Sequence, residues 1–550
     1  MIFDTLENID AAKYDAVVVG GGPAGLSFAM EMAAHGKTVL VLESGGFSPD
    51  EDQQKLSDAD LVDPQSHEDM LIAVARRLGG TSNLWAGRCV PYDPIDFVDR
   101  PNIENASWPI GLDEITPYYE RASWYLSGGE TRYSDPLNGI DIDDDDFSFD
   151  RLERYSNCPA IQVGHEEALQ YNPNIDIRLN TTLVDLAFSE NGDVRSIRVK
   201  RPDGQAMDIA VTTLVLACGG LETTRQLLVA QRKHPDRFGG ANGALGKFYM
   251  GHVTGEISDI TFKNRSLEKG LNFYVDRDGT YVRRRFVPSD AVQLENDLTN
   301  IAFWPVVPPI ADAAHRSGIL SLLFLALSTQ PWGGMFIAEA IRRKHVPEGI
   351  AKIPHLLNVV RQLPQSAAFG FSFLYKRYLS SSRIPGFFVL NPGHRYGLSY
   401  HAEQVPSEKS RVYLSEKKDK FGVDRLVIDL NFSERDAEPI LRSHKLLRDW
   451  LHKHELGTID YRDPEEDAIQ RIIEIATHGT HQIGLARMGK DAKRAIVDKD
   501  LRVFDSRNLY LLTSAVFPTS GQCNPTLTIV AMGLRLTQHL LGRENTQKIE

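Results

Sequence analysis

Residues 14–44 read YDAVVVGGGPAGLSFAMEMAAHGKTVLVLES and carry the strongest structural signal in the chain. An apolar run ends at Gly20, and Gly20, Gly22 and Gly25 form a GxGxxG pattern at the start of a helical stretch. A second apolar run ends at Glu43, so the segment predicts a strand–helix–strand unit that binds a dinucleotide. In such a unit the first two glycines let the backbone approach a pyrophosphate, and the third lets the helix pack closely on the strand.

Glu43 ends the second predicted strand, where an acidic side chain accepts hydrogen bonds from the ribose of an adenosine. An acid there suits the free ribose of FAD or NAD better than the phosphorylated ribose of NADP. Farther along, the runs LVDLAF, VRSIRVK and MDIAV predict a three-stranded meander, and the apolar run LVLA, Gly219 and a helix from about Leu221 follow it. No second GxGxxG comes after this region, so the sequence favours FAD over a separate NAD domain. The predicted fold class is α/β.

Composition narrows the class of protein further. The chain has 550 residues, with 61 Lys and Arg against 74 Asp and Glu, and its net charge of −13 argues against nucleic-acid binding. The four cysteines lie far apart without a CxxC pair, which predicts free thiols in a reducing compartment. The acidic run at Asp141 has Asp146 and Leu152 where a calcium loop needs Gly and Glu, so no metal site is predicted. Acidic residues near the N-terminus do not resemble a signal peptide, and we expect a cytoplasmic protein.

The middle of the chain, residues 318–383, is apolar and locally basic. Residues 341–383 contain eight basic residues and one acid, Glu348, which gives a local charge of +7. One interpretation is a helical cap over the substrate site with a solvated basic face, and this is the one we favour. The alternative is a set of amphipathic helices that lie on an anionic membrane, as a peripheral contact at its inner face. Polar residues interrupt the apolar run 318–341, which argues against a membrane-spanning helix.

Several motifs near the C-terminus point to one known family. The chain reads HGTHQIGLARMG at 478–489, SAVFPT at 514–519 and NPTLT at 524–528. With the N-terminal glycine pattern, the loop RLGGTSNLWAG at 77–87, and Glu403-Gln404 ahead of Ser410-Arg411-Val412, these motifs resemble the glucose-methanol-choline (GMC) oxidoreductase family. The resemblance implies an FAD-binding Rossmann-like domain interleaved with a substrate-binding or cap domain. We expect residues 1–255 and 476–550 to form the FAD-binding part and residues 256–475, with the basic insertion 318–383, to form the cap.

The resemblance also implies a catalytic pair, His481 in the HxxG motif and Asn524. A hydroxyl must lose its proton as hydride leaves the same carbon, and an imidazole is a suitable base. Asn524 would orient the substrate oxygen. His478 remains an alternative base. Asn524 also precedes Pro525 and a periodic apolar run, so it could serve as a helix N-cap, a role compatible with catalysis.

The residues expected to contact FAD come from five stretches of the chain. Some sugar-oxidising relatives attach FAD covalently to a His in the loop where Leu84 and Trp85 stand here, so we expect noncovalent FAD. The predicted cofactor-binding residues are Gly20, Gly22, Gly25, Glu43, Gly79, Gly80, Thr81, Ser82, Asn83, Trp85, Ala86, Gly219, Ser514, Pro525 and Thr526.

Three departures from the common family pattern bear on the substrate. Trp85, Thr223-Thr224 and Thr513 differ from the usual residues, and GGTSNLWAG resembles the bacterial branch that oxidises sugars and glycosides. We therefore expect oxidation of a secondary sugar hydroxyl to a ketone, with oxygen or a quinone as the electron acceptor. The alternatives are an enzyme for a lipid-linked or other amphiphilic alcohol that uses a quinone, a lyase of the same family, and a flavin-binding protein without turnover.

Overall fold

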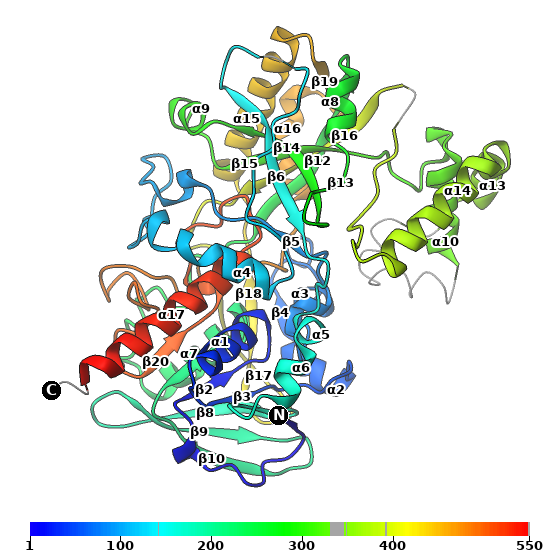
Figure 1. The fold of residues 1–550 in the computed structure, drawn as a ribbon. Helices are drawn as coiled ribbons and strands as arrows, with labels where there is room; N and C mark the ends of the chain where they lie inside the picture. Colours follow the sequence, from blue (N-terminus) through cyan, green and yellow to red (C-terminus); the bar gives the residue numbers. More distant parts are fainter. Residues whose placement is uncertain (141, 330–345, 348, 391–392, 548–550) are drawn as a thin grey trace.

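The computed structural model describes residues 1–140, 142–329, 346–347, 349–390 and 393–547. Its base is a parallel sheet with the strand order β1-β7-β3-β2-β11-β20 (Figure 1). The strands are β1 (Ile2–Phe3), β2 (Ala16–Val19), β3 (Val39–Leu42), β7 (Ile175–Arg178), β11 (Leu214–Leu216) and β20 (Leu509–Leu511). Strands β2, β3, β11 and β20 are apolar runs, as expected for a parallel sheet that is covered on both faces.

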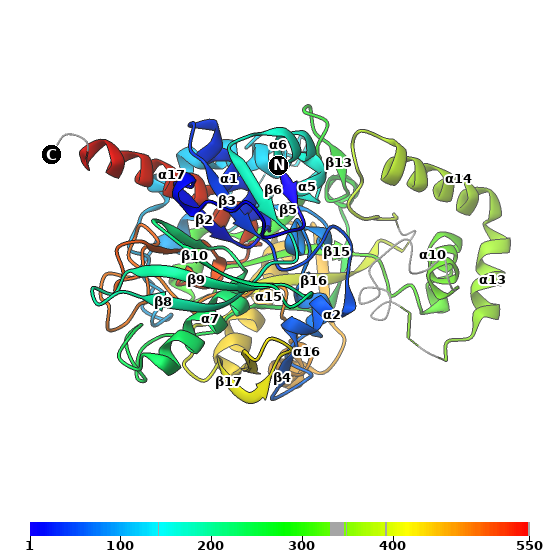
Figure 2. The same ribbon diagram turned by 90° about the horizontal axis from the view of Figure 1, so that it is seen from below.

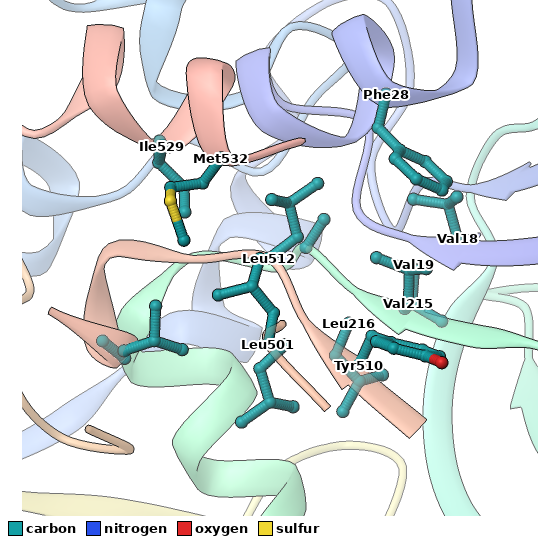
Figure 3. Packing of buried hydrophobic residues seen from close by; sticks show 14 of the residues in the cluster. Val18, Val19, Phe28, Val215, Leu216, Leu501, Tyr510, Leu512, Ile529 and Met532 are labelled. Atoms are coloured by element: carbon teal, nitrogen blue, oxygen red, sulfur yellow. The ribbon is translucent and has the colours of Figure 1, made fainter. Parts of the chain in front are cut away.

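The predicted strand–helix–strand unit is confirmed as β2, helix α1 (Pro23–Ala34) and β3. Helices α1 and α17 (Thr526–Gln547) pack against each other on one face of the sheet. Figure 3 shows Phe28 of α1 and Met532 of α17 on the same side of the sheet as Val18 and Val215. The glycine pattern and the C-terminal motifs, which are far apart in sequence, therefore meet at one sheet.

The predicted meander is also confirmed. Strands β8 (Thr182–Phe188), β9 (Val194–Lys200) and β10 (Ala206–Ala210) form an antiparallel sheet in the order β10-β9-β8. Helix α7 (Gly220–Lys233) follows β11, as expected from the sequence. A further small sheet pairs β4 (Ala59–Leu61) with β18 (Asp424–Asp429), which pairs with β17 (Arg411–Lys418).

An eight-stranded antiparallel sheet forms the second layer of the molecule. Its order is β19-β12-β16-β15-β14-β6-β5, and β13 pairs with β14. Helices α15 (Glu434–Lys453) and α16 (Ala468–Ile475) pack on it and share its apolar core. The strands are β5 (Arg88–Cys89), β6 (Phe147–Tyr155), β12 (His252–Phe262), β13 (Tyr274–Val275), β14 (Tyr281–Pro288), β15 (Ile301–Val306), β16 (Arg395–Glu403) and β19 (Gly457–Tyr461). Because β5 and β6 come from the first 255 residues, the predicted sequence boundaries do not coincide with the limits of this sheet, and the domain boundaries stay a prediction.

Three helices project from one side of the molecule, as Figures 1 and 2 both show. They are α10 (Gly318–Ser328), α13 (Lys352–Arg361) and α14 (Leu363–Leu374), and a short π-helix at Tyr375–Leu379 continues α14. We call residues 318–328 and 352–379 the projecting helices. No helix among the described residues is long and apolar enough to cross a membrane. Of the charges predicted for this segment, those between 341 and 345 and at 348 lie outside the described residues, as does Asp141 of the acidic run.

The four cysteines are free thiols, as predicted from their spacing. The other α-helices among the described residues are short: α2 (Glu51–Gln54), α3 (Met70–Ala73), α4 (Tyr119–Tyr125), α5 (Ile161–Gly164), α6 (Glu166–Tyr171), α8 (Arg265–Gly270) and α9 (Asp290–Glu295).

Candidate active site

A cavity of about 1680 Å³ runs from the parallel sheet to the projecting helices. At one end it is lined by residues that follow the carboxyl ends of β2, β3, β11 and β20, where parallel α/β sheets bind their ligands. A pocket for a single small ligand typically measures about 300–1,000 Å³. The cavity is therefore large enough for a dinucleotide together with a substrate.

The glycine loop is shaped for a pyrophosphate. A Cβ on Gly25 would lie 2.1 Å from the carbonyl oxygen of Gly20, so only glycine lets α1 approach the loop this closely. A Cβ on Gly22 would meet nothing closer than Gly80 Cα at 4.0 Å, and Gly22 faces the cavity. The first turn of α1 therefore leaves open space beside the helix N-terminus, which is where an anion is stabilised.

Glu43 fixes the backbone at the edge of this loop through hydrogen bonds. Its two carboxylate oxygens each accept a backbone N–H at 2.8 Å, from Gly21 and from Gly45. Burial raises the pKa of Glu43, against the opposing effect of these hydrogen bonds. Each carboxylate oxygen has a second lone pair, so Glu43 can also accept a hydrogen bond from a ribose, and it lines the cavity.

Thirteen of the fifteen predicted cofactor residues line the cavity, and two do not. Gly25 packs behind the loop, and Gly79 donates its N–H to Gly21 O at 2.7 Å. Trp85 lines the cavity while its indole N–H donates to Pro159 O at 2.9 Å. The residues that line the cavity are Gly20, Gly22, Glu43, Gly80, Thr81, Ser82, Asn83, Trp85, Ala86, Gly219, Ser514, Pro525 and Thr526. The cavity that these residues line fits FAD, and the individual role of each residue stays a prediction.

The HxxG loop is fixed by backbone pairing with the segment before β12. Met250 and Ile483 exchange two backbone hydrogen bonds, at 2.9 and 3.0 Å. This pairing places His481 beside His252, the first residue of β12. The Nδ1 atoms of the two imidazoles lie 2.8 Å apart, and Nε2 of His481 lies 3.1 Å from Nδ2 of Asn524. The structure thus brings the two predicted catalytic residues together at the cavity wall.

The direction of each hydrogen bond in this group follows from its two ends. Arg88 can only donate, and its Nη1 lies 2.8 Å from Asn524 Oδ1, so the amide nitrogen of Asn524 must face His481 and donate to Nε2. At the other end, Nε2 of His252 lies 3.1 Å from the carbonyl oxygen of Ser520, which can only accept. His252 Nδ1 is therefore an acceptor, and His481 donates from Nδ1. His481 keeps a lone pair on Nε2, the atom that faces Asn524.

Asn524 precedes α17, which begins at Thr526. Arg88 and His481 both form hydrogen bonds with the side chain of Asn524, so this side chain is part of the site although it lies close to the helix N-terminus. His478 also lines the cavity, and its ring centre lies 4.7 Å from that of His481. His481 is the histidine whose Nε2 meets Asn524.

Burial keeps these imidazoles neutral. It lowers the pKa of His481 well below the ordinary value, and the neighbouring His252 and the guanidinium of Arg88 lower it further. Burial also lowers the pKa of His252 and of His401 well below the ordinary value, with contributions from nearby histidines and Arg88. A neutral imidazole is the form that can take a proton.

His252, His401 and His481 also form a group whose nitrogens lie within 4.8 Å of one another, as metal ligands can. Hydrogen bonds already account for their positions: His401 Nδ1 lies 2.7 Å from Gln522 O, and His252 Nε2 faces Ser520 O. The 2.8 Å between His252 and His481 is shorter than the roughly 3.3 Å expected between two nitrogens on one tetrahedral zinc ion with bonds of about 2.0–2.1 Å. The geometry fits a hydrogen-bonded network better than a metal centre.

A buried ion-pair group supports Arg88 from behind. Arg88 Nε lies 2.5 Å from Glu153, and Arg283 of β14 also donates to this carboxylate. The guanidinium groups of Arg88 and Arg283 both lie over the ring of Trp304. These ion pairs hold the pKa of Glu153 low, at about 2, in spite of its burial. Arg88, Arg283 and Trp304 line the cavity near His401 and His481.

Sequence reasoning missed Arg88, His252 and His401. Arg88 directly follows the quoted loop 77–87, and His401 precedes the quoted Glu403, so proximity to these motifs was a usable signal. His252 stands in no recognisable pattern. It reaches the site because β12 and β16 are paired, with His401 opposite Thr254.

Comparison with known proteins agrees with this geometry. A family model described as GMC oxidoreductase matches residues 406–533, and one described as FAD binding domain matches residues 15–48. The 6'''-hydroxyparomomycin C oxidase of Streptomyces lividus is 31% identical, over 96% of this chain and 91% of that protein. The 2-methyl-1,2-propanediol dehydrogenase of Mycolicibacterium austroafricanum is 21% identical, over 97% of this chain and 96% of that protein.

Solved structures share the fold at low sequence identity. A formate oxidase variant from Aspergillus oryzae superposes with a TM-score of 0.54 at 14% identity, over 97% of this chain and 99% of that one. Pyridoxine 4-oxidase from Mesorbium loti gives 0.51 at 17%, over 96% and 99%. The fold, the cofactor cavity and these matches define an FAD-dependent oxidoreductase that acts on CH–OH groups. The chain belongs to the GMC oxidoreductase family, which confirms the expected family, fold class and cofactor.

Proposed function

We propose that the enzyme oxidises a secondary hydroxyl of a sugar or glycoside to a ketone, with His481 as the general base. The observation that carries the proposal is the pairing of His481 Nε2 with Asn524 Nδ2, 3.1 Å apart, at the wall of the cavity. One lone pair and one N–H donor thus lie side by side. A hydroxyl group, which has one proton to give and lone pairs to accept with, is complementary to such a pair.

The chemistry follows from these two atoms. The substrate hydroxyl replaces the hydrogen bond between Asn524 and His481: its O–H donates to His481 Nε2 in place of Asn524, and its oxygen accepts a hydrogen bond from Asn524 Nδ2. FAD, when bound, accepts the hydride from the carbon that bears this hydroxyl. As the carbon loses hydride, its oxygen loses the proton to His481, and the C–O single bond becomes a carbonyl. The proton then rests on His481, whose Nδ1–H continues to donate to His252, and general-base catalysis of this kind typically contributes ~10² to 10⁴ in rate.

The substrate end of the cavity supports a hydroxyl-rich ring. Arg88 and Arg283 offer guanidinium donors, and the Trp304 ring beside them gives a flat apolar surface. Sugars pair with such surfaces because they carry hydroxyls at their edges and C–H groups on their faces. Two related proteins are named paromamine 6'-oxidase, from Streptomyces fradiae, and 6'''-hydroxyparomomycin C oxidase, which supports a sugar-like substrate here.

An amphiphilic alcohol, with a quinone as electron acceptor, is the second candidate function. The observation that favours it is the apolar outer wall of the cavity, built from Leu322, Leu323, Phe369 and Phe373 of the projecting helices. A glycoside with an apolar tail would satisfy both ends of the cavity. Oxygen remains the alternative acceptor, and the cytoplasmic location stays a prediction.

The test is an anaerobic screen of monosaccharides, glycosides and glycolipids, read by the visible absorbance of the flavin. Oxidation of a bound alcohol bleaches the flavin, and the ketone product is identified by mass spectrometry. A lyase would turn over its substrate with the flavin left oxidised, and a binding protein without turnover would show neither change. Bleaching only by primary alcohols would reject the secondary hydroxyl. Reoxidation by air or by a soluble quinone then identifies the acceptor.

A further inference from the structure

Helix α13 buries polar side chains and exposes apolar ones. His355 and Asn358 are its buried residues, and both contact Ser321 Oγ of α10 at 3.1 Å. Gln362, which follows the helix, accepts the N–H of Gly318 at 2.9 Å. These three polar residues face α10 because they recur at helical spacing. The apolar stripe of α13 must therefore point away from the protein.

Further large apolar side chains are exposed on helix α14 and on the residues that follow it. Ile353, Leu356, Leu357 and Val360 are exposed along α13 at spacings of three and four residues. Of the 23 exposed large hydrophobic residues among the described parts of the chain, 12 fall between residues 350 and 390. We call the following residues the outer face: Ile353, Leu356, Leu357, Val360, Leu363, Phe371, Leu374, Tyr375, Tyr378 and Leu379. Such a concentration marks an interaction surface, since single exposed apolar residues are otherwise scattered.

The charge around the outer face has one sign. Residues 349–390 contain five basic residues and no acidic residue, in a chain with a net charge of −13. Lys352, Arg361 and Lys376 are exposed on the same helices as the outer face. A patch that combines apolar side chains with lysine and arginine is complementary to an anionic lipid surface, where apolar groups enter the interface and cations meet headgroups.

The outer face adjoins the mouth of the catalytic cavity. Leu374 and Tyr378 are both exposed on the outer face and part of the cavity lining. Phe369 and Phe373 of α14 also line the cavity, as do His481 and Asn524. One cavity therefore combines apolar side chains that adjoin the outer face with the catalytic pair.

We propose that the outer face docks on an anionic membrane surface and that the cavity draws an amphiphilic hydroxylated substrate from it. The apolar tail of the substrate lies along Phe369 and Phe373, and its hydroxyl reaches His481. The docking rests on the exposed side chains alone. The substrate class rests on the proposed function.

Sedimentation of the FAD-loaded enzyme with phosphatidylcholine vesicles, with and without phosphatidylglycerol, tests the docking. We expect binding only to the anionic vesicles and its loss at high salt. Lys352→Ala and Lys376→Ala should each weaken partitioning about fivefold. Phe371→Ser and Leu379→Ser, at side chains 79% and 77% exposed, should each weaken it about tenfold. Tyr171→Ser, 69% exposed on α6, and Lys13→Ala are the matched controls and should bind like the unchanged enzyme.

Two outcomes would overturn the docking. One is the absence of salt-sensitive binding to anionic vesicles. The other is a dimer in light scattering that Phe371→Ser dissociates, which would assign the outer face to a second copy of the chain. Vesicle binding needs no turnover, so it can be measured even if no alcohol bleaches the flavin. A failure of the proposed function is therefore distinguished from a failure of the docking.

The substrate class is tested with short- and long-chain alkyl glycosides of the same sugar. We expect a higher kcat/KM for the long chain, and Leu374→Ser should lower kcat/KM more for the long chain than for the short one. Equal values for the two chains in the unchanged enzyme would reject the amphiphilic substrate and leave sugar oxidation intact.

Discussion

His481 and His252 face each other through their Nδ1 atoms, 2.8 Å apart. Two imidazoles can form this hydrogen bond only if one Nδ1 is protonated and the other is not. Two groups determine which Nδ1 carries the proton. Arg88 can only donate and acts on His481 through Asn524, whereas the carbonyl of Ser520 can only accept and acts on His252. His252 is therefore a positioning residue that fixes the tautomer of His481.

Removing this acceptor should slow catalysis without loss of cofactor. In His252→Leu, Nδ1–H of His481 has no acceptor, and the ring can turn or change tautomer. We expect the rate of flavin reduction to fall about 100-fold, as for a misaligned reacting group. His252→Asn keeps an acceptor near the position of Nδ1 and should recover part of the rate. Equal rates for the two variants, at full FAD content, would reject the positioning role.

Arg88 should act through the orientation of Asn524. In Arg88→Met the Oδ1 of Asn524 loses its donor, and the amide is free to rotate, which misplaces the donor to the substrate oxygen. We expect kcat to fall about 100-fold, the usual cost of losing one such donor. Arg88→Lys keeps a donor and should lose less. Rapid-reaction reduction rates and FAD content check this, and an unchanged kcat in Arg88→Met would contradict it.

The pH dependence should reflect the lowered pKa of His481. The base acts only when unprotonated, so a pKa below the ordinary value of about 6.5 keeps the enzyme active at lower pH. We expect the acidic limb of kcat/KM against pH to lie below pH ~6.5. Arg88→Met removes a cation that lowers this pKa, so its acidic limb should move to higher pH. A limb that stays in place in this variant would show that another group titrates.

Two glycines of the nucleotide loop should respond differently to alanine. Gly25→Ala puts a Cβ 2.1 Å from Gly20 O, and we expect about 1–3 kcal/mol of destabilisation, seen as a lower Tm of the apoprotein. Gly22→Ala has room in the protein, with its nearest neighbour at 4.0 Å, so its Tm should be normal. Its Cβ instead occupies the space for the pyrophosphate, and FAD should bind about tenfold more weakly or worse. Gly46→Ala, whose nearest atom would lie at 3.6 Å on the Asn180 side chain, is the control. Normal FAD affinity in Gly22→Ala would place the pyrophosphate elsewhere.

Sequence patterns were sufficient to predict the elements and residues that are defined by local spacing. The glycine pattern predicted β2, α1 and β3, and the HxxG and NPT motifs located two residues that the structure brings to 3.1 Å. The partners of this pair could not be predicted in the same way. His252 lies 229 residues before His481, and tertiary pairing, of β12 with β16 and of Met250 with Ile483, brings them together.

The projecting helices show a second kind of limit. The sequence indicated amphipathic helices with basic residues, but periodicity alone cannot tell which face is buried. In α13 the buried face is the polar one, because His355 and Asn358 find partners on α10. That choice depends on tertiary contacts, and it leaves the apolar stripe exposed.

The central claim is that His481 takes the proton from the substrate hydroxyl. The direct measurement is the anaerobic rate of flavin reduction by one bleaching alcohol, for the unchanged enzyme, His481→Ala and His478→Ala, each with its FAD content determined. We predict that His481→Ala retains FAD and is reduced ~10² to 10⁴ times more slowly, while His478→Ala stays within about tenfold of the unchanged enzyme. Reduction of His481→Ala at the unchanged rate, or a larger loss in His478→Ala, would contradict the account.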